Sequence, residues 1–204
     1  FRMRIFNSDG SEAMMCGNGS RCVGKFVYDK GLTEKKSVTL ETLSGIKILN
    51  LHVENGKVES VSVDMGKSQI LTLGGNTTPF VNQPITAKGI TMNGTAVSMG
   101  NPHLVFFVEN AEIFDVASVG PAFEHHPWFE NRTNVEFAQI LSPAKIRMRV
   151  WERGSGITMA CGTGACATFA AAKECGLVNG KTTLVLDGGE LQIENSSTNG
   201  DVIM

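Results

Sequence analysis

The sequence lacks the features that mark membrane, secreted disulfide-rich and nucleic-acid-binding proteins. No apolar run approaches the roughly 18 residues of a membrane span, and no basic start with an apolar stretch indicates a signal peptide. The net charge of −2 shows no bias toward nucleic acid or anionic membranes. Five cysteines, an odd number, do not fit a secreted disulfide framework, so we expect reduced thiols. These absences predict a soluble cytoplasmic protein.

Motifs for the common cofactors are also missing. No βαβ repetition with a Gly-x-Gly-x-x-Gly opening is present, which disfavours a dinucleotide-binding fold. Neither a pyridoxal-type lysine motif nor a metal-ligand cluster occurs. Zinc is a weak alternative, because the Cys16 to Cys22 and Cys161 to Cys166 spacings lack the short cysteine pairing of structural zinc sites. We therefore expect no cofactor and no metal.

The sequence does contain an internal repeat. Residues 2–32 align without a gap with residues 147–177, 145 positions later, and nine of the 31 aligned positions are identical. Average residue frequencies would give only about two identities. Each copy carries a Cys-Gly-x-Gly turn, which starts at Cys16 in the first copy and at Cys161 in the second. The repeat predicts a chain of two related halves.

The periodicity of apolar residues predicts an α+β fold. Basic and apolar side chains alternate in residues 2–7 and 145–151, which is typical of strands with one buried face. Helices are expected over residues 19–30 and 164–175, each followed by a C′ glycine, Gly31 or Gly176. Further strands are expected at 38–43, 46–53, 58–65, 182–187 and 190–194, with hairpin turns at Asn55-Gly56 and Asn93-Gly94.

We expect two pseudo-symmetric halves, each a mostly antiparallel sheet wrapped around a central helix, with the active-site cleft between them. The N-terminal half-domain is placed at residues 1–65 and is incomplete at its start. The C-terminal half-domain is placed at residues 66–204, with the last few residues returning toward the first half. The chain begins at Phe1 in a strand-like segment and stops at Met204 in an apolar run. We therefore expect it to be a piece of a longer polypeptide.

The repeated turn combines a thiol with a site for an anion. A cysteine at a helix start lies beside unpaired first-turn N–H groups, whose partial positive charge is expected to lower the pKa of the thiol. The same N–H groups can bind a carboxylate, since the glycines let it approach the backbone closely. If the two helices point at each other, the carbon beside that carboxylate lies between two thiols. One thiolate can then remove the α-proton while the opposite thiol protonates the other face.

The cysteines also have other interpretations. A lone cysteine at a helix start is more often a small buried residue, although two at equivalent repeat positions favour chemistry. A disulfide between Cys16 and Cys161, or a redox role, is an open alternative. The cysteines inside the helices are predicted to pack, and a histidine pair is predicted to lie in a surface loop: Cys22, Cys166 and Cys175, and His125-His126.

Four separated motifs together resemble the diaminopimelate epimerase family. They are Asn7-Ser8-Asp9-Gly10-Ser11 leading to Met15-Cys16-Gly17-Asn18-Gly19-Ser20-Arg21-Cys22, Gly100-Asn101-Pro102-His103, Thr133-Asn134-Val135-Glu136, and Trp151-Glu152-Arg153-Gly154-Ser155-Gly156 leading to Ala160-Cys161-Gly162-Thr163-Gly164-Ala165-Cys166. The resemblance runs from Phe1 to Met204. It implies a cofactor-independent isomerase that interconverts LL- and meso-diaminopimelate in lysine and peptidoglycan-precursor synthesis, folded as two pseudo-symmetric halves and assembled as a homodimer.

The resemblance also implies the roles of individual residues. Cys161 is implied as the base and Cys16 as the acid for the LL substrate, with the roles exchanged in reverse. Backbone N–H groups bind the reacting carboxylate, at Gly17, Asn18, Gly162 and Thr163. Four residues recognise the distal end of the substrate: Asn7, Asn101, Asn134 and Arg153. Glu152 takes an ammonium group, and His103 and Glu152 tune the thiols.

Two departures from the family pattern and two alternatives are noted. Ile157 stands where many members have Glu, and the opening segment with a Gly-Asn-Asp-Phe motif and a downstream Gln is absent, as is the closing segment. We expect the intact protein to carry both segments. A racemase or epimerase of another amino acid, such as histidine or lanthionine, is the alternative enzyme. A non-catalytic anion-binding module is the alternative from another class.

Overall fold

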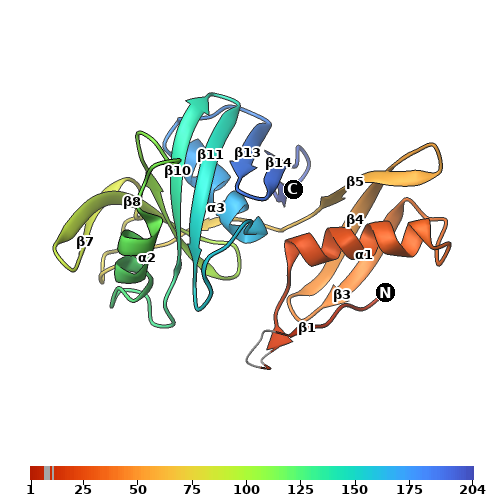
Figure 1. Ribbon diagram of the computed structural model, residues 1–204, viewed down its shortest axis with the longest axis horizontal. Helices are drawn as coiled ribbons and strands as arrows, with labels where there is room; N and C mark the ends of the chain where they lie inside the picture. The colour runs from red at the N-terminus through yellow and green to blue at the C-terminus, as the bar shows by residue number, and fades with distance from the viewer. Residues whose placement is uncertain (7–9, 11) are drawn as a thin grey trace. The chain divides into compact units, whose positions relative to one another are not determined.

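The computed structural model describes residues 1–6, 10 and 12–204, which divide into two compact units (Figure 1). The first unit contains Phe1–Met65 and Ile203–Met204, and the second contains Gly66–Val202. The chain therefore passes between the units twice. In the described part of the chain, no helix has both the length and the apolar character needed to cross a membrane.

The first unit is a helix on a three-stranded antiparallel sheet. Helix α1 (Gly17–Asp29) packs on β4 (Gly45–Glu54) and β5 (Lys57–Val63), and β3 (Ser37–Thr42) completes the sheet (Figure 1). Alternate strand residues such as Leu49 and Leu51 are buried toward the helix, as their period of two predicts. The short strands β1 (Ile5–Phe6) and β2 (Glu12–Ala13) form a separate hairpin. The helix covers one face of this sheet, so the expected wrapping of a sheet around the helix is absent from the described residues of this unit.

The second unit contains one large mixed sheet, whose last strand, β15, begins in this unit at Val202 and ends at Ile203, which is counted with the first unit. Its strands run in the order β15-β14-β13-β11-β10-β9-β8-β6, with β7 paired to β8 and β12 paired to β11. The pairs β9–β10 and β11–β13 are parallel, whereas hairpins such as β7–β8 and β10–β11 are antiparallel. The strands are β6 (Gln69–Ile70), β7 (Gln83–Ala87), β8 (Ile90–Ser98), β9 (Pro102–Phe107), β10 (Asn134–Ser142), β11 (Lys145–Glu152), β12 (Gly156–Ile157), β13 (Thr182–Leu186), β14 (Gly189–Asn195) and β15 (Val202–Ile203). The predicted α+β class is confirmed.

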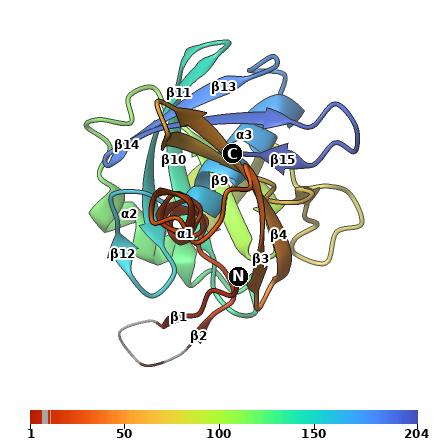
Figure 2. The same cartoon turned by 90° about the vertical axis from the view of Figure 1, so that its right-hand side faces the viewer.

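Helix α3 (Gly162–Glu174) is the central helix of the second unit. Ten of its 13 residues are buried, five of them alanine, and strands β8, β9, β10, β11, β13 and β14 all contact it. Figure 2 shows α3 among these strands. Helix α2 (Val116–Glu124) packs on β10, β11 and β12, where Phe123 joins Phe106 and Phe137 in an aromatic core. Small alanine side chains let the strands approach α3 closely from several directions.

One of the two predicted hairpin turns is correct. Asn55-Gly56 joins β4 and β5 with positive φ angles of 50° and 76°, as a two-residue turn requires. Asn93-Gly94 instead lies inside β8, and the turn before this strand is formed by Lys88-Gly89, with φ angles of 49° and 80°. A Cβ at Gly94 would lie 2.9 Å from side-chain atoms of Leu104 and Phe106. Glycine is needed there for close packing and not for a turn.

Three further expectations need correction. The strand predicted over residues 2–7 is limited to β1 in the described part, with a single bridge from Arg2 to Glu41. His126 is buried and only His125 is exposed, so the histidine pair is not a surface loop as a whole. Cys22 is exposed on α1 and does not pack in a core, whereas Cys166 is fully buried.

Candidate active site

The two repeated cysteines begin their helices in the same way. Cys16 is the N-cap of α1, with φ −136° and ψ 115°, and Cys161 is the N-cap of α3, with φ −124° and ψ 112°. The Cys16 sulfur accepts the N–H of Gly19 at 3.4 Å, and the Cys161 sulfur accepts the N–H of Gly164 at 3.3 Å. The thiol therefore takes the place that a serine or aspartate oxygen usually takes at a helix start.

The helix ends also match. In α1, the N–H of Leu32 donates to the Val27 carbonyl at 2.9 Å, and in α3 the N–H of Leu177 donates to the Ala172 carbonyl at 2.8 Å. The predicted C′ glycines have φ angles of 70° at Gly31 and 69° at Gly176. Both ends are therefore Schellman motifs, in which glycine adopts the left-handed conformation at little cost.

The short hairpins before the helices keep the same register. Phe6 pairs with Glu12 in β1–β2, and Trp151 pairs with Ile157 in β11–β12. Trp151 follows Phe6 by 145 residues, and Ile157 follows Glu12 by the same number, which is the offset of the sequence repeat. Over the described residues, the strand pairing, the helix start and the helix end are therefore duplicated. Ile157, which departs from the family pattern, is the exposed member of its pair.

The first turn of each helix supplies N–H donors beside the thiol. Helix geometry leaves the N–H groups of Gly17 and Asn18 in α1, and of Gly162 and Thr163 in α3, without intrahelical acceptors. The Asn18 side chain accepts a hydrogen bond from Arg21 at 2.9 Å, so its amide oxygen is used within the helix. Backbone donors at a helix N-terminus favour a bound anion, which is the property on which the predicted carboxylate site rests.

Four polar side chains connect Cys161 to the interior of the second unit. The Thr163 hydroxyl lies 3.6 Å from the Cys161 sulfur and accepts the Asn101 amide N–H at 3.3 Å. The Asn101 oxygen lies 3.1 Å from Nε2 of His103, and Nδ1 of His103 lies 2.7 Å from Oε1 of Glu136. The structure therefore brings together three residues selected from the sequence, Asn101, His103 and Thr163, with Cys161.

The thiol of Cys161 is harder to ionise than the helix start alone predicts. Burial raises the pKa of Cys161, and the negative charges of Glu152 and Glu136 raise it further. Hydrogen bonds from Thr163 and the Gly164 N–H lower the pKa but are outweighed. The sequence-based expectation of a lowered pKa is therefore wrong for Cys161, because it counted the helix N–H groups and not the burial.

Glu136 ends the Thr133-Asn134-Val135-Glu136 motif, but the sequence assigns it no role. It lies on β10 with no exposed surface, flanked by the buried residues Val135 and Phe137. Burial raises the pKa of Glu136 against the opposing effect of His103. A carboxyl group inside a fully buried strand segment was a signal available in the sequence, since unpaired charges are rarely buried.

Of the predicted distal residues, Arg153 lies in the turn after β11, whereas Asn134 begins β10 and Asn101 precedes β9. The backbone N–H of Arg153 donates to the Asn134 side-chain oxygen at 2.9 Å, and the Arg153 guanidinium donates to the Asn131 carbonyl at 2.9 Å. Glu152 accepts a hydrogen bond from the Thr158 hydroxyl. The Asn134 amide also donates to the Pro102 carbonyl at 3.0 Å, so this asparagine holds the backbone of the turn. Asn7, the remaining predicted binding residue, lies outside the described residues.

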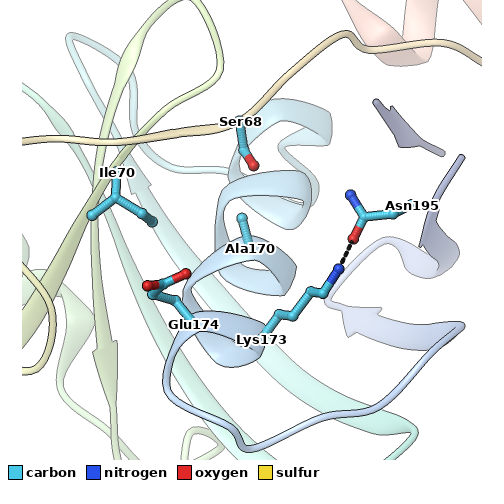
Figure 3. A pocket seen from close by; sticks show the side chains of 6 residues that line it. All are labelled: Ser68, Ile70, Ala170, Lys173, Glu174 and Asn195. Carbon is cyan, nitrogen blue, oxygen red and sulfur yellow. Dashed lines mark hydrogen bonds between the residues drawn. The ribbon is translucent and has the colours of Figure 1, made fainter. Parts of the chain in front are cut away.

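A cavity of about 330 Å³ lies beside the C-terminal half of α3 (Figure 3). Its lining includes Lys173, whose ammonium donates to Asn195 at 2.6 Å. Lys173 lies about 18 Å along the helix from Cys161, at 1.5 Å per residue. The cavity is therefore remote from the thiol. Among residues 1–6, 10 and 12–204, no cluster of three or more His, Cys, Asp or Glu side chains could hold a metal ion.

Comparison with known proteins identifies close sequence relatives. The family model described as "Diaminopimelate epimerase" matches residues 1–71 and 95–204. A diaminopimelate epimerase of Phocaeicola vulgatus is 55% identical over 210 residues, covering 100% of this chain and 74% of that protein. The enzyme of the same name from Methanococcus maripaludis strain C5 is 50% identical over 208 residues, covering 100% of this chain and 75% of that protein.

Solved structures of proteins with other names have a similar fold. A hydroxyproline epimerase from Agrobacterium vitis has a TM-score of 0.72 at 16% identity, over 99% of this chain and 65% of that one. A PhzF-family phenazine biosynthesis protein from Bacillus anthracis has a TM-score of 0.68 at 15% identity, over 99% of this chain and 75% of that one. At such low identity these likenesses concern the fold alone.

Proposed function

Because this chain belongs to the diaminopimelate epimerase family, a family of isomerases, we propose that it interconverts LL- and meso-diaminopimelate through two thiols, Cys16 and Cys161. The observation that carries the proposal is the equivalent N-cap position of both sulfurs on duplicated helix starts. Each compact unit therefore contributes one of the two proton carriers. The reaction belongs to lysine and peptidoglycan-precursor synthesis.

The proposed reaction moves one proton off the α-carbon and another onto it. With the LL substrate, the Cys161 thiolate takes the α-proton, and the Cys16 thiol gives its proton to the opposite face. The configuration inverts, and the thiolate is left on Cys16, so the reverse reaction uses the same two groups with exchanged roles. No electrons are transferred, so the reaction needs no redox partner.

The helix starts supply the electrostatic part of the proposal. The N–H groups of Gly17, Asn18, Gly162 and Thr163 bind the carboxylate of the reacting centre. As the α-proton leaves, negative charge moves onto that carboxylate, where two helix N-termini stabilise it. This stabilisation replaces the electron sink that a cofactor supplies in other amino-acid racemases.

Glu152 links substrate binding to ionisation of the base. Its negative charge contributes to the raised pKa of Cys161. A substrate ammonium group bound by Glu152 neutralises this charge, which lowers the pKa of the nearby thiol. In this proposal the thiolate forms when the substrate arrives, and the empty site keeps Cys161 protonated.

The distal carboxylate of the substrate is assigned to the guanidinium of Arg153. A guanidinium offers a planar pair of donors to a carboxylate. Asn101 and Asn7 complete the distal site, and Asn134 fixes the Arg153 backbone. A second carboxylate favours diaminopimelate over histidine, and lanthionine is the alternative substrate that shares it.

The organisation of the molecule is part of the same proposal. In this proposal, residues 1–65 and 66–204 are the two half-domains. The two compact units divide at Met65 and Gly66, which supports this boundary. The protein is placed in the cytoplasm as a homodimer, in line with the family resemblance.

Exchange of α-protons with deuterated water tests this function. The intact protein is incubated with diaminopimelate, lanthionine, histidine and alanine, and deuterium at each α-carbon is followed by NMR. Among these substrates we expect rapid exchange with diaminopimelate alone, loss of exchange from the LL isomer in Cys161→Ala, and retention in the exposed control Cys22→Ala. Faster exchange with lanthionine or histidine reassigns the substrate. No exchange with any of them would favour the anion-binding module.

A further inference from the structure

Glu136 is a buried acid next to the candidate base, and the proposed reaction does not use it. Its Oε1 lies 2.7 Å from Nδ1 of His103, and both side chains have no exposed surface. Oε2 is buried and has no hydrogen-bond partner among the described residues. A buried acid with one free oxygen costs folding free energy, which points to a use beyond filling space.

A chain of polar contacts connects Glu136 through His103 to Cys161. Nε2 of His103 lies 3.1 Å from the Asn101 oxygen, and the Asn101 amide nitrogen lies 3.3 Å from the Thr163 hydroxyl. That hydroxyl lies 3.6 Å from the Cys161 sulfur. The amide oxygen of Asn101 can only accept, so Nε2 carries a proton. Nδ1 is then the ring position that Glu136 holds.

The start of α3 independently shows that this carboxyl is built into the thiol's surroundings. A Cβ placed on Gly164 would lie 2.7 Å from Oε1 of Glu136 and 3.2 Å from the Cys161 sulfur. Gly164 is also the residue whose N–H donates to that sulfur. The helix start can take this position only because Gly164 has no side chain to displace the carboxyl group.

We propose that Glu136 is a positioning residue of the reaction, which orients His103 and, through Asn101, fixes the Thr163 hydroxyl against the sulfur of Cys161. This inference rests on the proposed function of Cys161 as a proton carrier. Burial raises the pKa of Glu136. The proton held between Oε1 of Glu136 and Nδ1 of His103 fixes the imidazole ring, while Nε2 donates to Asn101.

The proposal predicts different effects for two substitutions of Glu136. Glu136→Gln keeps an N–H donor for Nδ1, so kcat should stay within about threefold of wild type. Glu136→Leu removes the donor at similar volume, and kcat should fall by about tenfold to a hundredfold with a smaller change in KM, since Glu136 itself makes no substrate contact. Circular dichroism and thermal unfolding establish that both variants are folded.

A double-variant cycle separates positioning from a general structural effect. Thr163→Val removes the hydroxyl at the other end of the connection, so it should lower kcat, and adding Glu136→Leu should cause little further loss. Thr168→Val is the matched control, because it deletes another buried hydroxyl of α3, one bonded to the Met148 sulfur. Its kcat should be unchanged.

Each outcome decides the matter. Unchanged kcat in Glu136→Leu, or fully additive losses in the double variant, overturns the positioning role while the proposed function stands. If wild type exchanges no α-proton, both fall. If Glu136→Leu does not fold, the decision passes to the other two variants. Retained activity in Glu136→Gln with reduced kcat in Thr163→Val supports the proposal, and unchanged kcat in Thr163→Val overturns it.

Discussion

Glu124 accepts a hydrogen bond from the backbone N–H of Gly154 at 2.9 Å, and this bond ties the end of α2 to the turn that carries Arg153. The same buried carboxylate accepts the Trp151 indole N–H at 2.7 Å and a guanidinium N–H of Arg132 at 3.1 Å. Three donors that converge on one carboxylate fix the turn. The position of Arg153 therefore depends on a residue that lies 29 positions earlier in the chain.

Glu124→Ala should destabilise the protein and lower activity together. It leaves the Trp151 and Gly154 donors without their acceptor, which is expected to cost about 2 to 4 kcal/mol of unfolding free energy. Urea unfolding measures this cost, with Glu174→Ala as the control at an exposed glutamate. An unfolding free energy equal to that of the control variant would contradict the role of Glu124.

Acid should remove the contribution of Glu124. Burial acts to raise the pKa of Glu124, but hydrogen bonds from Trp151 and Gly154 and the charges of His125 and Arg132 outweigh it, so the pKa lies below 4.5. The stabilisation is therefore complete above pH 4.5 and is lost as the pH falls through the lowered value. Glu124→Gln should flatten the pH dependence of stability in that acidic range. If the pH dependence of stability in Glu124→Gln equals that of wild type, Glu124 does not cause the loss of stability in acid.

Arg153→Lys tests recognition of the distal carboxylate. An ammonium group cannot reproduce the two parallel hydrogen bonds of a guanidinium, and a charged hydrogen bond contributes about 1.5 to 3 kcal/mol. KM for diaminopimelate should rise by about tenfold or more. Arg2→Lys is the control, since the Arg2 side chain forms an exposed ion pair with Glu41 at 3.8 Å. Unchanged KM and kcat in Arg153→Lys would exclude this residue from the site.

Alkylation tests the ionisation of Cys161 in the empty enzyme. Burial and the charges of Glu152 and Glu136 raise the pKa of this thiol, so iodoacetamide should react slowly near pH 7 and faster as the pH rises toward about 10. Glu152→Gln removes one negative charge and should speed the reaction at any fixed pH. Mass spectrometry follows each cysteine, with exposed Cys22 as the internal reference. Fast labelling of Cys161 at neutral pH would contradict the raised pKa of this thiol.

Oxidation tests whether the two thiols face one substrate carbon. The proposed reaction requires the two sulfurs to lie on either side of one carbon, and thiols at that spacing can form a disulfide when no substrate separates them. Mild oxidation should therefore inactivate the intact enzyme through a Cys16–Cys161 bridge, dithiothreitol should restore turnover, and bound substrate should protect. Peptide mapping identifies the bridge. A bridge that joins other cysteines would show that the two helix starts do not face each other.

The duplicated helices were predictable because their limits depend on local chemistry. The cysteine N-caps and the C′ glycines Gly31 and Gly176 are signals within a few residues of the helix ends, and the structure places α1 and α3 within about two residues of the predicted ranges. Strands β3, β4 and β5 followed from alternation of apolar residues. In contrast, Asn93-Gly94 resembles a turn by composition, and only the packing of Phe106 shows why glycine stands inside β8.

The environment of the candidate site was harder to predict from the sequence. The raised pKa of Cys161 depends on burial and on Glu136, which lies 25 positions away in the chain, so a local pattern could not reveal it. The parallel pairing of β9 with β10 places Asn134 opposite His103, which brings two separate motifs together. That pairing, like the Glu124 contact with Gly154, is a product of tertiary structure.

In the proposed reaction, each face of the α-carbon has its own proton carrier. The most direct test follows the proton at early conversion, when the intact enzyme acts on a single diaminopimelate stereoisomer in deuterated water. We expect the product to carry deuterium at the inverted carbon, while recovered substrate keeps its original proton, since the opposite thiol supplies solvent deuterium. A product that retains the original proton would contradict the two-thiol reaction, because one group would then serve both faces.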